Sequence, residues 1–294
     1  MQGSIAQIVA LTTYGNAFLV GAPGADLSAF FPTNSTFTFC EHVRFVDLGR
    51  MAGKANEVPY ADDPPTWLAQ LKRDKTRGLR MVYGPTDEKQ LRERKVTDRM
   101  LVAFVGGGGR WLIEAISDRG SDYWEGRWEV GDRERKDQRI WRVTYGRVAM
   151  SQPFADLPTI DLSTLSNELA VNLKAIANFA RKHDLNGFAD AFDAGLAQLS
   201  SNAPLAGVYH KDLAPHQAVT LPAARLLGAA QAAWVFGGMG SWNDLGFKGD
   251  EQAHYGQLSE ELYRLLNVAI VAGANAGTPP LSGPARKARW KMWS

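Results

Sequence analysis

The chain has 294 residues, of which 45% are hydrophobic and 22% are charged, and its formal net charge is +2. This composition excludes a disordered or fibrous protein, and the length is sufficient for one large domain or two modest domains. No apolar run reaches the ~18 residues that a membrane-spanning helix requires, so no membrane span is expected. The single cysteine, Cys40, excludes an internal disulfide, and we expect a cytoplasmic protein without a signal peptide.

Residues 5–11 and 17–20 are predicted to form a β-hairpin at the start of the chain. Both segments are rich in aliphatic residues, and Gly15-Asn16 between them is typical of a tight turn. Another strand is expected over 35–47, because aromatic and β-branched side chains recur there at every second position. The first part of the chain is therefore predicted to be a sheet.

An antiparallel meander of four short strands is predicted over 99–148. The four glycines at 106–109 are interpreted as its first hairpin turn. A phosphate-binding loop is the alternative for these glycines, but the next segment suits a strand rather than the helix that such a loop needs. The expected strands are 100–105, 111–116, 123–130 and 139–148.

After the prolines at 153 and 158, apolar residues recur with the helical period of 3.6. The helices are expected at 162–180, 185–199, 221–236 and 258–272. The predicted fold class is therefore α+β, with a mostly antiparallel sheet-rich domain over 1–157 and an α-helical domain over 158–277. A Pro/Gly linker and a basic aromatic tail follow over 278–294.

The candidate catalytic residues are His210, Asp212, His216 and Glu41. Imidazole and carboxylate groups that lie close together can carry hydrolytic or general acid–base chemistry. Glu41 falls on the strand face that is predicted to be buried, and burial would raise its pKa and suit a general acid or base. A β-bulge or a position at the rim of the sheet is the alternative for Glu41. Cys40 is interpreted as a small buried hydrophobic residue.

Metal binding is considered for His210, Asp212, Glu251 and His254. His210, Asp212 and His254 match the linear spacing of a two-histidine, one-carboxylate iron site, but His254 lies in a helical stretch rather than on a strand. Glu251 and His254 share one helix face, as in di-iron bundles, yet a second such motif is missing, and a solvated helix N-terminus is the alternative. No metal ion or cofactor is therefore assigned.

Two segments are candidate contacts for a ligand or a partner. One is the glycine-rich loop between two apolar helices, for which a purely structural loop is the alternative. The other is the basic tail, for which residues 151–284 offer a complementary surface with twelve acidic and seven basic residues. The candidate contacts are Ser241, Trp242, Asn243, Asp244, Arg286, Arg289, Trp290 and Trp293.

Two functions of different classes are expected. The first is a non-catalytic binding or assembly protein of a soluble complex, which contacts a protein partner or a second copy through the helical domain and the tail. The alternative is a hydrolytic or metal-assisted enzyme with its site around His210, Asp212, His216 and the 241–244 loop. Residues 72–99 are rich in basic side chains, but five acidic side chains are interleaved among the ten basic ones, so tight nucleic-acid binding is not expected.

Overall fold

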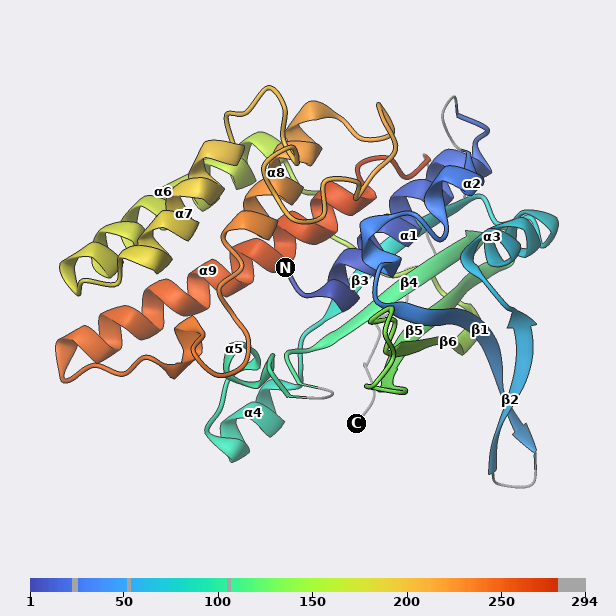
Figure 1. Cartoon of the computed structure of the whole chain (residues 1–294), viewed down its shortest axis with the longest axis horizontal. Coiled ribbons are helices and arrows are strands. Elements are labelled where there is room, and N and C mark those ends of the chain that lie inside the picture. Colours follow the sequence, from blue (N-terminus) through green and yellow to red (C-terminus); the bar gives the residue numbers. More distant parts are fainter. Residues whose placement is uncertain (23–25, 52–53, 105–106, 280–294) are drawn as a thin grey trace.

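The computed structural model describes residues 1–22, 26–51, 54–104 and 107–279. Six strands form one mixed sheet in the order β2-β1-β6-β5-β4-β3, and helices pack beside it (Figure 1). In the described residues, β1 and β6 run parallel and the other neighbouring pairs are antiparallel, so the predicted α+β class is confirmed with a mixed sheet. The strands are β1 (Cys40–Met51), β2 (Lys54–Ala61), β3 (Gly78–Gly84), β4 (Arg110–Ser117), β5 (Gly120–Val130) and β6 (Trp141–Gln152).

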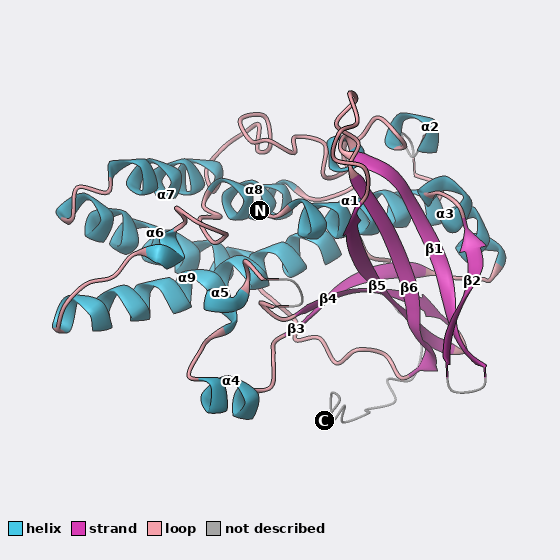
Figure 2. Ribbon diagram, turned by 60° about the horizontal axis from the view of Figure 1, so that its bottom comes forward, coloured by secondary structure: helices cyan, strands magenta, loops and turns pink. Residues whose placement is uncertain are grey.

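The four helices predicted for the second half of the chain are confirmed, although the last begins eight residues earlier than its apolar pattern. Figure 2 shows the sheet toward one end of the molecule and these helices toward the other. None of the helices in the described part of the chain combines the length and hydrophobicity that a membrane crossing requires. The helices are α1 (Gly3–Leu19), α2 (Leu27–Phe30), α3 (Pro64–Arg73), α4 (Glu88–Arg94), α5 (Asp98–Leu101), α6 (Leu162–Lys182), α7 (Asn186–Gln198), α8 (Leu221–Ala232) and α9 (Asp250–Asn275), with the short 3₁₀ helices η1 (Ser35–Phe37) and η2 (Trp242–Asp244).

The hairpin predicted at the start of the chain is wrong, because these residues form the single helix α1. This helix packs against β3 and β4 and also against α9. Apolar side chains are therefore buried on several of its faces. A helix that is buried all round shows no amphipathic period in its sequence. Gly15 is therefore not a turn residue but a point of close packing, where a Cβ atom would collide with the side chains of Leu79 and Leu68.

The strand predicted at 100–105 is also wrong. This stretch contains the end of α5 and a turn, and β4 pairs with β3 and β5 instead. Gly108 and Gly109 lead into β4 with φ angles of 80° and 84°, and added Cβ atoms there would press on Val102 and Tyr83. These two glycines therefore allow close packing rather than a hairpin turn, while Gly106 lies outside the described residues.

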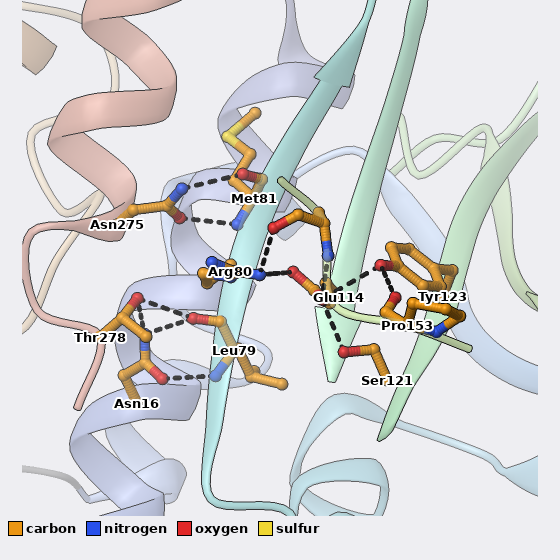
Figure 3. Close-up of polar contacts among 11 residues, drawn as sticks. Asn16, Leu79, Arg80, Met81, Glu114, Ser121, Tyr123, Pro153, Asn275 and Thr278 are labelled. Atoms are coloured by element: carbon orange, nitrogen blue, oxygen red, sulfur yellow. Dashed lines mark hydrogen bonds and ion pairs between the residues drawn. The ribbon is translucent and has the colours of Figure 1, made fainter. Parts of the chain in front are cut away.

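Two asparagine side chains close the edge strand β3 (Figure 3). Asn16 of α1 donates to the Leu79 carbonyl oxygen at 2.9 Å and accepts from the Leu79 amide at 2.7 Å. Asn275, the last residue of α9, pairs in the same way with the amide and carbonyl groups of Met81, at 2.7 and 2.9 Å. The two amides thus satisfy backbone groups that an edge strand would otherwise present to another chain.

The buried carboxylate of Glu114 joins β3, β4, β5 and the segment that follows β6 (Figure 3). It accepts hydrogen bonds from Arg80 at 2.8 Å, from Ser121 at 2.6 Å, from Tyr123 at 3.1 Å and from the Ala155 amide at 2.9 Å. A buried charge is tolerated when it is paired and hydrogen-bonded in this way. Glu114 therefore fixes how the chain leaves the sheet toward α6.

One hydrophobic cluster extends through both halves of the chain. It includes Leu11 of α1, Phe45 and Trp124 of the sheet, and Leu173 and Leu266 of the helices. Packing therefore crosses the predicted boundary between residues 157 and 158.

Candidate functional site

Two adjoining hollows lie at the end of the sheet where β1 and β6 begin and β5 ends. The first, called here the histidine cavity, has a volume of about 240 Å³, and the second, the arginine hollow, has a volume of about 410 Å³. The histidine cavity is lined by Met1, Gly3, Ser35, Thr36, Phe39, Cys40, Trp128, Trp141, Tyr209 and His210. The arginine hollow is lined by Phe39, Arg133, Arg135, Gln138, Ile140 and Trp141.

Four aromatic side chains form the apolar walls of the histidine cavity. Trp128 of β5 and Trp141 of β6 meet edge to face, with ring centroids 5.9 Å apart, and both are half-buried. Phe39 and Tyr209 are 40% and 67% exposed, so they leave aromatic surface open to solvent. Exposed aromatic surface around a concavity is characteristic of a binding site.

A polar network joins Ser35, His210 and Asp212 at the wall of the histidine cavity. The Ser35 hydroxyl lies 2.9 Å from His210 Nδ1 and donates to Asp212 Oδ1, while the Ser35 amide donates to Asp212 Oδ2 at 2.7 Å. Because the hydroxyl has one proton, and Asp212 receives it, the Nδ1–H of His210 must donate to the Ser35 oxygen. The neutral imidazole then carries an unprotonated Nε2.

His210 is held in this neutral form by its surroundings. The residue is only 6% exposed, and burial lowers the pKa of its imidazole from 6.5 to about 4. The side chain of Gln231 fixes its backbone, since it accepts from the His210 amide at 2.6 Å and donates to the His210 carbonyl oxygen at 3.1 Å. His210 therefore offers a hydrogen-bond acceptor rather than a positive charge at neutral pH.

Segments far apart in the sequence are joined to build this wall. Asn34 caps η1 by accepting from the Thr36 amide at 3.0 Å, and it donates to the Asp212 carbonyl oxygen at 2.6 Å. Thr13 of α1 donates to the carbonyl oxygen of Leu213 at 2.6 Å. The position of Ser35 beside His210 thus depends on α1, η1 and the segment before α8.

The Cys40 thiol is a weak nucleophile in this environment. Burial raises the pKa of the thiol to about 11, and the side chain of Gln7 donates to its sulfur at 3.5 Å. Gln7 also accepts from the Tyr145 hydroxyl at 3.0 Å, and this hydrogen bond holds the Gln7 side chain in place beside the sulfur. Cys40 packs in the hydrophobic cluster, in line with its interpretation as a small buried residue.

Glu41 lies at a β-bulge rather than in the core. The register between β1 and β6 shifts between Cys40 and His42, so Cys40 and Val43 both face the core although they are three residues apart. The Glu41 carboxylate instead accepts from Arg142 Nε at 2.8 Å. This hydrogen bond lowers the pKa of Glu41, which is opposite to the raised pKa that a buried general acid would need.

Within the described residues, His216 and the 241–244 loop take no part in the hydrogen bonds that join Ser35, His210 and Asp212. His216 is exposed, and it lines neither hollow. Trp242 is fully buried and donates to Ser259 at 2.7 Å, and Asn243 exchanges hydrogen bonds with Arg99 at 2.6 and 2.8 Å. Ser241 and Asp244 hydrogen-bond within their own loop.

The candidate metal ligands are distributed over separate contacts. Glu251 accepts from Lys182 and lies 3.1 Å from His183 Nε2, and His254 packs edge-on against Phe179 with ring centroids 5.3 Å apart. His210 and Asp212 instead belong to the Ser35 network. In the part of the chain that the structure describes, no three His, Cys, Asp or Glu side chains gather so as to hold a metal ion.

The proposed tail contacts Arg286, Arg289, Trp290 and Trp293 lie outside the described residues. Comparisons with protein-family models, with curated proteins and with solved structures found no match to this chain. The assignment of the candidate site therefore comes from the geometry of this structure alone.

The sequence patterns did not identify Ser35, Phe39, Tyr209, Trp128 and Trp141 as site residues. One signal was available for the tryptophans, since they flank the charged stretch between two expected strands and therefore lie near one end of the sheet. No local pattern connects Ser35 with His210, because 175 positions separate them.

Proposed function

We propose that the protein is a non-catalytic binding protein whose ligand occupies the histidine cavity. The observation that carries this proposal is the group of partly exposed aromatic side chains around a concavity with a fixed polar wall. Aromatic walls provide most of the binding energy of such sites, and a few positioned polar groups set the orientation of the ligand.

The hydrogen bonding of Ser35 favours binding over catalysis. Its amide already donates to Asp212 Oδ2, so this amide is not free to stabilise an oxyanion. Its hydroxyl donates to Asp212 rather than to His210, which differs from a nucleophile that is activated by an adjacent imidazole. The network therefore suits a rigid wall that offers the His210 Nε2 acceptor to a ligand.

The proposal is tested by isothermal titration calorimetry with the neutral aromatic probe 2-naphthalenemethanol. We expect Tyr209→Ala to weaken its binding by about tenfold, because an exposed aromatic wall is removed. The matched control is Phe104→Ala, since Phe104 is also 67% exposed and lines neither hollow. The proposal is wrong if the unaltered protein does not bind the probe, or if both variants bind it equally.

A hydrolytic enzyme is the second candidate, favoured by the unprotonated Nε2 of His210 at the cavity. In that case Nε2 would take a proton from water as the water oxygen attacks an ester carbonyl carbon. The acyl C–O bond would then break, and the departing alkoxide or phenolate would take the proton back from His210, which leaves the free acid and the alcohol or phenol. Hydrolysis of 4-nitrophenyl acetate by the unaltered protein should then be about tenfold faster than by His210→Gln, with His216→Gln as the control. Equal rates in all three proteins would exclude this candidate.

A further inference from the structure

We infer that the ligand is a small planar aromatic molecule that carries one anionic group, with its ring in the histidine cavity and the anionic group in the arginine hollow. This inference rests on the proposed function and names the chemical class of the ligand. Three observations carry it: the two hollows share a wall, arginines line the second hollow, and the Arg133 side chain has no partner among the described residues.

The two hollows share one wall on the sheet. Phe39 and Trp141 line both of them, and the Trp141 amide donates to the Phe39 carbonyl oxygen at 3.0 Å. Phe39 directly precedes β1 and Trp141 is the first residue of β6, so the sheet holds both side chains in place for each hollow. A molecule with a ring and a short substituent can therefore occupy both hollows at once.

The arginine hollow carries positive charge at its lining. Its described lining includes the guanidinium groups of Arg133 and Arg135 and the amide of Gln138, but no carboxylate. Arg135 is paired with Asp137, with Nε and Nη2 each donating to one carboxylate oxygen at 2.9 and 2.8 Å, and its Nη1 lies 4.0 Å from Glu41 Oε1. Arg135 is therefore already largely neutralised.

Arg133 is the guanidinium that remains for a ligand. It is exposed, and within the described residues its side chain makes no ion pair or hydrogen bond. Asp132 and Glu134 are its neighbours in the chain, but the Asp132 carboxylate accepts from the Glu134 amide at 2.9 Å within the loop itself. A guanidinium group presents paired donors that match a carboxylate or a phosphate.

The loop that carries Arg133 is held by its own hydrogen bonds. Gly131 donates its amide to the Ile140 carbonyl oxygen at 2.7 Å, and the Gln138 amide donates to the Arg135 carbonyl oxygen at 3.1 Å. The Asp137 carboxylate also accepts from the Arg139 amide at 3.1 Å. The position of the loop over the arginine hollow is therefore fixed before a ligand binds, which lowers the entropy lost on binding.

The test compares three probes of similar ring size by calorimetry. These are 2-naphthalenemethanol, 2-naphthoate and 2-naphthyl phosphate. We expect both anions to bind about tenfold more tightly than the neutral alcohol, because a charge-assisted hydrogen bond to Arg133 is added. The tighter of the two anions identifies the anionic group as a carboxylate or a phosphate.

The variant Arg133→Gln should remove the advantage of both anions and leave the binding of the neutral alcohol unchanged. Arg119→Gln is the matched control, because Arg119 is an exposed arginine next to the opposite end of β5 and lines neither hollow. Thermal unfolding of each variant shows that the fold is retained.

Two outcomes would overturn the inference and remain distinguishable. If the alcohol and the anions bind equally, and Arg133→Gln changes nothing, the ligand class is wrong while the proposed binding site stands. If none of the three probes binds the unaltered protein, the proposed function is wrong and the inference is wrong with it.

Discussion

Burial of the His210 imidazole links the stability of the cavity wall to pH. Its pKa is about 4 in the folded protein, against the ordinary value of 6.5. As the pH falls below 6.5, the unfolded chain takes up a proton that the folded protein does not accept until the pH is near 4. The folded state therefore loses stability over this window as the pH falls, and it gains stability as the pH rises through it.

We predict that His210→Gln flattens this pH dependence. The free energy of unfolding of the unaltered protein should fall between pH 7 and pH 4.5, and His210 should contribute roughly 2 kcal/mol of that fall. Urea unfolding at the two pH values measures the difference. His216→Gln is the control, because His216 is exposed and should leave the fall unchanged. An equally large fall in His210→Gln would contradict the burial argument.

The sequence identified part of the candidate site at the level of single residues. His210 and Asp212 are two positions apart, so the sequence alone indicates that they lie close together. In the structure both contact Ser35. The raised pKa predicted for Glu41 failed because one extra residue at the bulge changed the alternation of the strand. A bulge of this kind is set by pairing with β6, which the alternation along β1 does not reveal.

At the scale of elements, the end of α9 supplies the edge strand β3 with hydrogen-bond partners that a neighbouring strand would otherwise provide. Asn275 supplies both a donor and an acceptor to Met81, and Asn16 of α1 supplies both to Leu79. The helices thus position the sheet through backbone groups as well as through apolar contacts. This explains why helices from both ends of the chain meet at β3 (Figure 3).

Asn275→Ala is predicted to lower the free energy of unfolding by about 2 kcal/mol, because the amide and carbonyl groups of Met81 lose their partner in a partly buried position. Urea unfolding at neutral pH measures the change. Asn167→Ala is the control, because Asn167 is exposed on α6 and alanine is the better helix former there. A loss of equal size in both variants would refute a specific role for Asn275.

The helix α6 could be predicted from the sequence because it has one polar face and one buried face. In α6, Leu165, Leu169, Leu173 and Ile176 form one buried stripe, and the period of this stripe is visible in the sequence. In α1 the buried residues occupy several faces, so the apolar run in its sequence looks the same as that of buried strands. Whether such a run forms a helix or a strand depends on the elements that pack around it, and the tertiary fold determines those elements.

At the scale of the whole molecule, the C-terminal tail remains the predicted contact for self-association or a partner. Deletion of residues 285–294 should lower the melting temperature by roughly 5 °C or reduce the mass of the oligomer, because its tryptophans are expected to be buried on an acidic surface. Calorimetry and light scattering measure the two quantities. A truncated protein that keeps both would show that the tail serves an external partner.

We predict that the described fold unfolds in a single transition, because contacts cross the predicted domain boundary between residues 157 and 158. Tyr263 of α9 donates to the Gly108 carbonyl oxygen at 2.8 Å, and Arg99 of α5 pairs with Glu260 at 2.9 Å. The hydrophobic cluster also contains residues of both the sheet and the helices, so loss of one half exposes the apolar surface of the other.

Two signals in one thermal scan test this prediction. Circular dichroism at 222 nm reports mainly on the helices, whereas five of the nine tryptophans lie within residues 1–157 and make fluorescence sensitive to the sheet. The two midpoints should coincide, and Asn275→Ala should shift both by the same amount because its contact lies on the shared β3 edge. Separate midpoints would instead mean that residues 1–157 and 158–277 are independently stable units.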